Sequence, residues 1–467
     1  MTEAGAGSTA ARLLVTMNAK AYLIIAAAAV VSMSESPAQQ RGKSVPPELE
    51  ARLKEFFVQK EDQAHALAKE ENSEQAPEVW AFFKAGKEGD WKNVGSIYRT
   101  LRSGAYQYEG TRTDKRLVTM AWQPVNEAYG AYEGFSQGAE DYVVMFGQEI
   151  LDSMPLGSIY FGGTDPGRWL VTGFSKSHAN ADPCFVLTQN ALADGLYLKY
   201  LRTMYGKRIV TPSDDDSKKA FADYVADAER RLKEGTLKPG ENATIVNGKT
   251  QVSGQVAVMQ INARIARMIF DANPKQEFFI EESFPLDWMY PYLSPNGLIM
   301  KINRKPPVEI STDVVRKDRE CWTRFVDRAL GQWLTPETSI KDVCDFATTV
   351  FERKEEGDYQ ADEKFVRNAY VCKTSSKLRS SIAGVYLWRW NNSKSPAEKQ
   401  RMAKEADFAF RQAYALCPYS PEAVHRYTSW LTEQGRSKDA LLLAQTAARL
   451  DPRNGKFSKL VEDLEDK

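Results

Sequence analysis

A glycine-rich loop between two expected secondary-structure elements offers the clearest binding chemistry in this sequence. The loop, Gly162-Gly163-Thr164-Asp165-Pro166-Gly167-Arg168, follows a short apolar run and precedes a segment with helical character. Ligands collect at such strand-to-helix loops in α/β sheets. The glycines allow a ligand to approach the backbone, the helix N-terminus favours an anion, and Arg168 suits a phosphate or carboxylate. The loop therefore predicts a site for a sugar or a nucleotide sugar.

The same loop has a second interpretation that needs no ligand. Its spacing matches neither G-x-G-x-x-G nor a Walker loop, and Asp165 would repel a phosphate. A carboxylate suits a sugar hydroxyl better than a phosphate. An aspartate before Pro166 is, however, also suitable as a helix cap. From the sequence, a ligand site and a plain strand-to-helix connection both remain open.

A second turn of the same kind, residues 188–194, follows the next apolar run. If the two runs are neighbouring parallel strands, the two turns meet at one edge of the sheet. Asn190 is equally suited to capping the following helix, and Asp194 to interacting with its dipole. The candidate ligand-binding residues are Gly162, Gly163, Thr164, Asp165, Arg168, Asn190 and Asp194.

No residue of this sequence is predicted to be catalytic. Glu281 and Glu282, followed by Asp287-Trp288, place carboxylates near an aromatic side chain, as glycosidases do. Neighbouring residues of a strand point to opposite faces, so we interpret the two glutamates as a solvated strand end. No Ser-His-Asp set can be proposed from the three widely separated histidines. These observations favour binding over catalysis and keep an enzyme as the alternative.

Metal and cofactor sites are not expected. The three histidines are widely separated, and the five cysteines include no C-x-x-C pair. The cysteines have apolar neighbours, which favours small core residues over a disulfide framework. We therefore predict no metal and no cofactor.

Composition describes an ordinary globular protein of two or three domains. The chain has 467 residues, of which 43% are hydrophobic. Lys+Arg and Asp+Glu number 62 each, so no net charge attracts nucleic acid or anionic lipid. We expect no nucleic-acid partner and only a transient membrane contact through the N-terminal segment.

The N-terminus resembles a secretory signal peptide. Lys20 precedes an apolar run at 21–31, and Ser36-Pro37-Ala38 supplies a small-x-small exit. The apolar run is shorter than the ~20 residues that span a bilayer. The prediction is a cleaved segment 1–38 and a periplasmic or otherwise exported protein. An uncleaved N-terminal anchor and a buried N-terminal helix are the alternatives.

The expected fold class is α+β with several domains. Helical patterns dominate both ends, while the middle alternates short apolar runs with amphipathic segments, as in a Rossmann-like α/β layer. The predicted strands are 158–161, 183–188, 207–210, 277–281 and 298–302, with a hairpin at 243–252 on Asn247-Gly248. The predicted parts are a signal at 1–38, a helical region at 39–154 with a hairpin at 77–102, an α/β domain at 155–307, a helical connector at 308–374 and repeats at 375–467.

The C-terminal region resembles the tetratricopeptide repeat family. Ala406, Phe410, Ala413 and Pro418 recur 34 residues later as Ala440, Ala444, Ala447 and Pro452. Small residues suit the crossing of paired helices, and Gly435 suits the turn between them. The resemblance implies helical hairpins that bind other proteins, closed by a capping helix at 457–464. The segment 77–102 is similar to a solitary hairpin of this type.

A second resemblance covers about 150–305. The stretches 150–165, 190–192 and 290–298 are similar to the soluble domain of bacterial protein O-mannosyltransferase-like membrane proteins. The family's transmembrane catalytic part has no counterpart here, so the resemblance implies an accessory module and no catalytic residue. We expect an exported scaffold that binds proteins of the cell envelope. The alternative is a sugar- or nucleotide-sugar-binding accessory domain, or enzyme, of envelope glycosylation that uses the loop 162–168.

Overall fold

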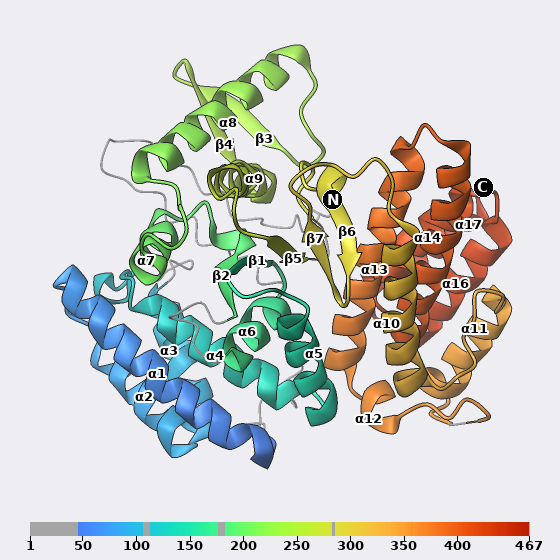
Figure 1. Cartoon of the computed structure of the whole chain (residues 1–467), viewed down its shortest axis with the longest axis horizontal. Helices are drawn as coiled ribbons and strands as arrows, with labels where there is room; N and C mark the ends of the chain where they lie inside the picture. The colour runs from blue at the N-terminus through green and yellow to red at the C-terminus, as the bar shows by residue number, and fades with distance from the viewer. Residues whose placement is uncertain (1–44, 106–112, 176–182, 283–284, 356, 467) are drawn as a thin grey trace, which may run out of the picture. The chain divides into compact units, whose positions relative to one another are not determined.

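The computed structural model describes residues 45–105, 113–175, 183–282, 285–355 and 357–466. These residues form two compact units, one of residues 189–272 and one of the remaining described segments. The chain is mostly helical with a small mixed sheet of five strands, so the expected α+β class is confirmed at this level (Figure 1). The predicted signal segment 1–38 lies outside the described residues.

The larger unit begins with helices. These are α1 (Pro47–Glu71), α2 (Pro77–Glu88), α3 (Trp91–Ala105), α4 (Trp122–Gln137) and α5 (Glu140–Asp152), with a short 3-10 turn η2 (Lys115–Leu117) before α4. The predicted hairpin at 77–102 is confirmed as α2 and α3. Pro77 starts α2, and Gly89 ends it with a φ of +78°, a conformation that glycine adopts without strain.

The five-stranded sheet also belongs to the larger unit. Its order is β2 (Cys184–Thr188), β1 (Ser158–Gly162), β5 (Phe278–Glu281), β7 (Ile299–Ile302) and β6 (Leu293–Asn296). The first three strands are parallel, and β7 runs antiparallel to β5 and β6. Helix α6 (Asp165–Phe174) connects β1 to β2 and packs on both. The parallel strands are buried throughout, which explains their continuous apolar sequences.

Two strand predictions fail. Residues 207–210 are not a strand: the Arg208 N–H turns back to Tyr205 O at 3.1 Å, and Val210 is exposed. The apolar pair Ile209-Val210 has no neighbouring strand to pair with in the described part of the chain, so it does not form a strand. Conversely, β6 was not predicted, and it contains Pro295. It pairs with β7 alone, and proline is tolerated on such an edge strand.

The smaller unit contains a 3-10 turn and helices around one hairpin. Its elements are η3 (Gln189–Ala191), α7 (Gly195–Tyr205), α8 (Asp214–Glu234), β3 (Asn242–Val246), β4 (Lys249–Ser253) and α9 (Gln255–Ala272). The predicted Asn-Gly hairpin is confirmed, with φ of +52° at Asn247 and +74° at Gly248. Buried Glu241 accepts hydrogen bonds from Tyr224 and Arg231, which anchors the hairpin to α8.

Helices follow the sheet in the larger unit. They are α10 (Thr312–Leu330), α11 (Ile340–Phe346), the π-helical turn η5 (Ala347–Glu352) and α12 (Glu363–Val366). The short 3-10 turn η4 (Tyr290–Tyr292) comes earlier, directly before β6. After α12 come α13 (Ala369–Asn392), α14 (Pro396–Leu416), α15 (Pro421–Glu433), α16 (Ser437–Leu450) and α17 (Gly455–Glu465), drawn in orange to red in Figure 1. No helix among the described residues is long and apolar enough to cross a membrane.

The C-terminal helices pack as successive antiparallel hairpins. Helix α13 packs on α14, α15 on α16, and α17 on α16. The small residues of the 34-residue repeat lie where the helices meet: Ala406, Ala413, Ala440 and Ala447 are each 0% exposed. Gly435 has a φ of +71° in the turn between α15 and α16, as its position predicted.

Candidate functional site

The glycine-rich loop lies beside the end of the neighbouring strand β5. Strands β1 and β5 are parallel and in register, so Gly162 is aligned with Glu281. One further hydrogen bond, from Gly163 N to Glu281 O at 2.8 Å, continues the pairing into the loop. The loop and the two glutamates are therefore at the same carboxyl edge of the sheet, where α/β proteins build sites.

Thr164 connects the loop to the Glu281 carboxylate. Its N–H donates to Glu281 Oε2 at 3.1 Å, and its hydroxyl donates to Oε1 at 2.7 Å. The same hydroxyl accepts from Gly167 N at 3.2 Å and thereby caps α6. Thr164 is the cap, so the interpretation of Asp165 as the cap is wrong. Asp165 is the first residue of the helix instead.

The loop glycines leave room for carboxylates of the protein itself. A Cβ atom at Gly163 would lie 1.9 Å from Glu282 Oε2, and one at Gly167 would lie 1.6 Å from Glu281 Oε2. No side chain fits at such distances without displacing a glutamate. The close approach that we expected for a ligand is made here by Glu281 and Glu282.

Both glutamates are buried, with 1% of Glu281 and 7% of Glu282 exposed. The interpretation as a solvated strand end is therefore wrong. Alternation along a strand does not separate them, because Glu282 lies past the end of β5. Burial raises the pKa of Glu281 to about 7, and the charge of Glu282 adds to this effect. The Thr164 hydrogen bonds and Lys377 act in the opposite direction.

Basic side chains of two C-terminal helices lie close to these carboxylates. Lys377 of α13 forms an ion pair with Glu422 of α15 at 3.1 Å, and its charge also reaches Glu281. Arg426 of α15 donates to Ser380 O at 3.1 Å. Burial lowers the pKa of Arg426, and the nearby carboxylates of Glu422 and Glu282 oppose this change. We call Thr164, Glu281, Glu282, Lys377 and Arg426 the carboxylate cluster.

A hydrogen bond to the main chain also joins α13 to the end of strand β5. The Ser381 hydroxyl of α13 donates to Glu282 O at 2.5 Å. Farther along α13, Arg389 donates to Pro291 O and Pro307 O, each at 2.7 Å. Helix α13 is thus bonded to the end of β5 and to the segments that flank β6 and β7. Chemically, the cluster can hold a proton near neutral pH and join the sheet to the hairpins.

Arg168 has a partner within its own helix. Its guanidinium pairs with Asp165 and lies 4.4 Å from the Trp169 ring centre. The side chain of Arg168 is 15% exposed and that of Asp165 is 43% exposed. The positive charge that we expected to attract an anion is therefore already balanced.

Asn190 and Asp194 belong to the smaller unit, whereas the five candidate residues of the loop belong to the larger one. Asp194 caps α7 by accepting from Leu196 N at 2.8 Å. Burial raises the pKa of Asp194, and hydrogen bonds from the first turn of α7 oppose the change. The main-chain oxygen of Asn190 accepts from Asn262 Nδ2 at 3.2 Å. The cap of α7 is therefore Asp194, and the structural alternative that made Asn190 the cap is wrong.

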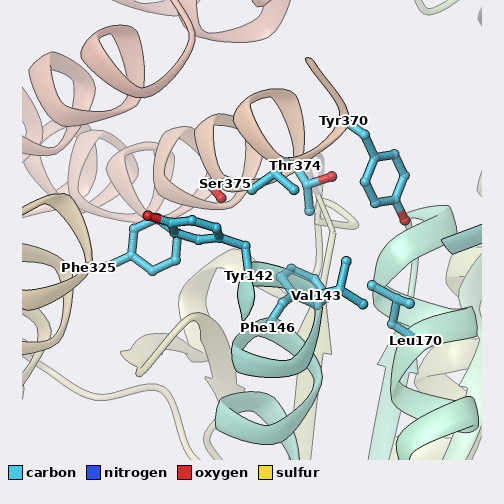
Figure 2. A pocket seen from close by; sticks show the side chains of 9 residues that line it. Tyr142, Val143, Phe146, Leu170, Phe325, Tyr370, Thr374 and Ser375 are labelled. Atoms are coloured by element: carbon cyan, nitrogen blue, oxygen red, sulfur yellow. The ribbon is translucent and has the colours of Figure 1, made fainter. Parts of the chain in front are cut away.

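Among the described residues, hollows of the larger unit lie at α5 and along α10, and no residue of the loop 162–168 lines either of them. Figure 2 shows the first hollow, where Tyr142, Val143 and Phe146 of α5 face α13. Its volume of about 10 Å³ leaves room for no more than one water molecule. An open depression of about 550 Å³ lies along α10, but one of its main charges, Arg319, is engaged by Glu405 through bonds of 2.7 and 2.8 Å. Neither hollow resembles an enclosed ligand site. In the part of the chain that the structure describes, no three His, Cys, Asp or Glu side chains gather as a metal site.

We compared the chain with known protein families, curated proteins and solved structures. The chain matches no family model, no curated protein and no solved structure. The function must therefore be inferred from the residues and their arrangement.

Proposed function

We propose that this protein is an exported interaction module whose C-terminal helical hairpins, of the tetratricopeptide type, bind another protein of the cell envelope. The observation that carries the proposal is the pair of successive hairpins α13–α14 and α15–α16, closed by α17. Their 34-residue repeat places fully buried small residues at the helix crossings. Stacked hairpins of this kind form extended binding surfaces.

The proposed binding surface lies on α15 and α17. Helix α15 buries Ala423, Val424, Tyr427 and Leu431 against its neighbours. Elsewhere on the helix, Glu422 and Arg426 contact α13, whereas Ser429 and Glu433 are exposed. Lys459 of α17 is exposed as well. The equivalent helix of the first hairpin, α13, is bonded to the sheet, which leaves the second hairpin and α17 for a partner.

The contacts of the glycine-rich loop favour this function over sugar binding. Arg168 is balanced by Asp165, and the space beside Gly163 and Gly167 is used by Glu282 and Glu281. Because side chains of the protein itself occupy the space beside the loop, we interpret the loop as structural. Calorimetry against nucleotide sugars tests the alternative: we expect no heat of binding for the wild type or for Arg168→Ala. Wild-type binding that Arg168→Ala removes would establish the loop as a site instead.

Site-specific photo-crosslinking in cells tests the proposed surface. A photoreactive amino acid replaces Ser429 or Lys459 on the proposed surface, or Lys399 of α14 or Lys438 of α16 as matched exposed controls. We expect discrete crosslinked bands from the first two positions, in the exported fraction, and none from the controls. Equal crosslinking at all four positions, or none at Ser429 and Lys459, would contradict the proposal.

A further inference from the structure

Helices α13 and α14 approach each other closely along a seam of small side chains. The Ser376 hydroxyl of α13 donates to Ala413 O of α14 at 2.7 Å. A serine hydroxyl is two bonds from its own Cα, so this hydrogen bond requires the two backbones to be near one another. One turn farther, Arg379 Nε donates to Gln412 Oε1 at 2.8 Å. As residue numbers rise on α13 they fall on α14, as in an antiparallel pair.

This register places two cysteines opposite each other. Cys372 comes four residues before Ser376, and Cys417 comes four residues after Ala413. A step of four residues keeps the same helix face and moves about 6 Å along the axis. Because the helices are antiparallel, both steps lead to the same end of the seam. Cys372 lies there in the first turn of α13, and Cys417 caps the end of α14.

The surroundings of the two thiols agree with this placement. Both residues are 0% exposed, and Cys372 Sγ donates to Phe365 O at 3.1 Å. Burial raises the pKa of Cys417 to about 12 and also raises the pKa of Cys372, to which the Cys417 sulfur contributes. The half-buried side chains of Lys373 and Tyr419 lie next to them, with Lys373 Nζ 5.6 Å from the Tyr419 ring centre.

We propose that Cys372 and Cys417 form a disulfide bond in the exported protein and thereby join the start of α13 to the end of α14. The inference goes beyond the proposed binding role and relies on export only for the oxidising compartment. Both residues are thiols in this structure. Cys184 of β2, Cys321 of α10 and Cys344 of α11 lie on other elements and remain thiols, which accounts for the odd number.

The oxidant is a donor disulfide, such as glutathione disulfide. One cysteine thiolate attacks the donor, releases one donor thiolate and forms a mixed disulfide; the second cysteine thiolate then displaces the other donor thiolate. Two protein thiols lose their protons and two electrons, and the donor disulfide is reduced to two thiols. Since burial disfavours the thiolate, we place this exchange before the hairpin closes, during folding.

The experiment uses the full chain, reduced, unfolded and then refolded with reduced and oxidised glutathione. After free thiols are alkylated, trypsin releases Cys372 in peptide 368–373 and Cys417 in peptide 412–426. We expect these two peptides to be linked, three alkylated cysteines per chain, and a melting temperature several degrees higher than that of the reduced protein. Native protein from the cell provides the same peptides for comparison.

Variants make the result specific. Cys372→Ser and Cys417→Ser should each abolish the linked peptide and raise the number of alkylated cysteines to four, whereas Cys184→Ser should retain the link. The double variant Cys372→Ala/Cys417→Ala should fold with the same melting temperature in oxidising and reducing buffer. Five alkylated cysteines after refolding with oxidised glutathione, or a link between other cysteines, would overturn the assignment. This outcome is independent of export and of partner crosslinking.

Discussion

Arg379 of α13 donates two hydrogen bonds, of 2.8 and 2.9 Å, to the carboxylate of Asp318 on α10, and both side chains are 1% exposed. Tyr386 donates a third bond to the same carboxylate at 2.9 Å. This buried network joins the first hairpin helix to a helix that precedes it by some forty residues. The hairpins are thus held to the rest of the larger unit by charge as well as by apolar packing.

Removing the charge of Asp318 should destabilise the protein strongly. We expect Asp318→Asn to lower the free energy of unfolding by about 3–5 kcal/mol, because Arg379 is left buried without a counter-charge. Chemical denaturation monitored by circular dichroism measures the loss. Glu320→Gln on the exposed side of the same helix should have no measurable effect. The apolar double variant Asp318→Leu/Arg379→Met should recover part of the loss, and a loss equal to that of Asp318→Asn would argue against an uncompensated charge as its cause.

Stability should depend on pH through Glu281. Its pKa is raised from the usual 4.5 to about 7 in the folded state. Between these pH values the folded protein keeps a proton on Glu281 that the unfolded chain has released. The contribution of Glu281 to the free energy of unfolding is therefore fully present below pH 4.5 and is lost as the pH rises toward 7. The decrease is on the order of 3 kcal/mol at most, since each pH unit is worth about 1.4 kcal/mol.

Glu281→Gln tests this pH dependence. Unfolding followed at several pH values should show a smaller decline for the variant than for the wild type. The control is Glu277→Gln, which changes an exposed glutamate just before the same strand and should leave the decline intact. Identical profiles for wild type and Glu281→Gln would mean that Glu281 titrates normally.

Adding a methyl group at Gly163 should disturb the carboxylate cluster. The new Cβ would overlap Glu282 Oε2, so we expect Gly163→Ala to destabilise the protein by about 1–3 kcal/mol. The double variant Gly163→Ala/Glu282→Ala removes the overlapping carboxylate and should be less destabilised than the sum of its single changes. Gly95→Ala in helix α3, where nothing lies within 4 Å, should instead stabilise by about 0.5–1 kcal/mol. Additive effects at positions 163 and 282 would show that the two do not meet.

Enlarging a small residue of the repeat should weaken the second hairpin. Ala447 is fully buried on α16, and Ala447→Leu should cost about 1–3 kcal/mol through overpacking. The neighbouring Ala448 is half-buried, and Ala448→Leu should be tolerated. Thermal unfolding compares the two variants. Equal melting temperatures for Ala447→Leu and the wild type would show that this face is not a close helix crossing.

Features that depend on neighbours in the chain were predictable from the sequence. Pro77 and Gly89 mark the ends of a helix, Asn247-Gly248 turns a hairpin, and the 34-residue repeat of alanines locates the crossings of the last hairpins. These signals work because helix ends, tight turns and helix faces are determined by the conformational limits and spacing of nearby residues. Strand β6 and the false strand at 207–210 show where such local rules fail.

The candidate site, in contrast, was decided by tertiary structure. From the sequence, Glu281 is the polar end of a strand, whereas in the structure it is buried and bonded to Thr164 of a distant loop. Likewise, nothing near Asp318 in the chain indicates Arg379, and Cys372 meets Cys417 only through the register of α13 and α14. Burial and charge pairing depend on which distant segments pack together. The residue pattern within one segment does not predict that packing. The sequence determined the helices and turns, and the packing between them determined which polar groups lie inside.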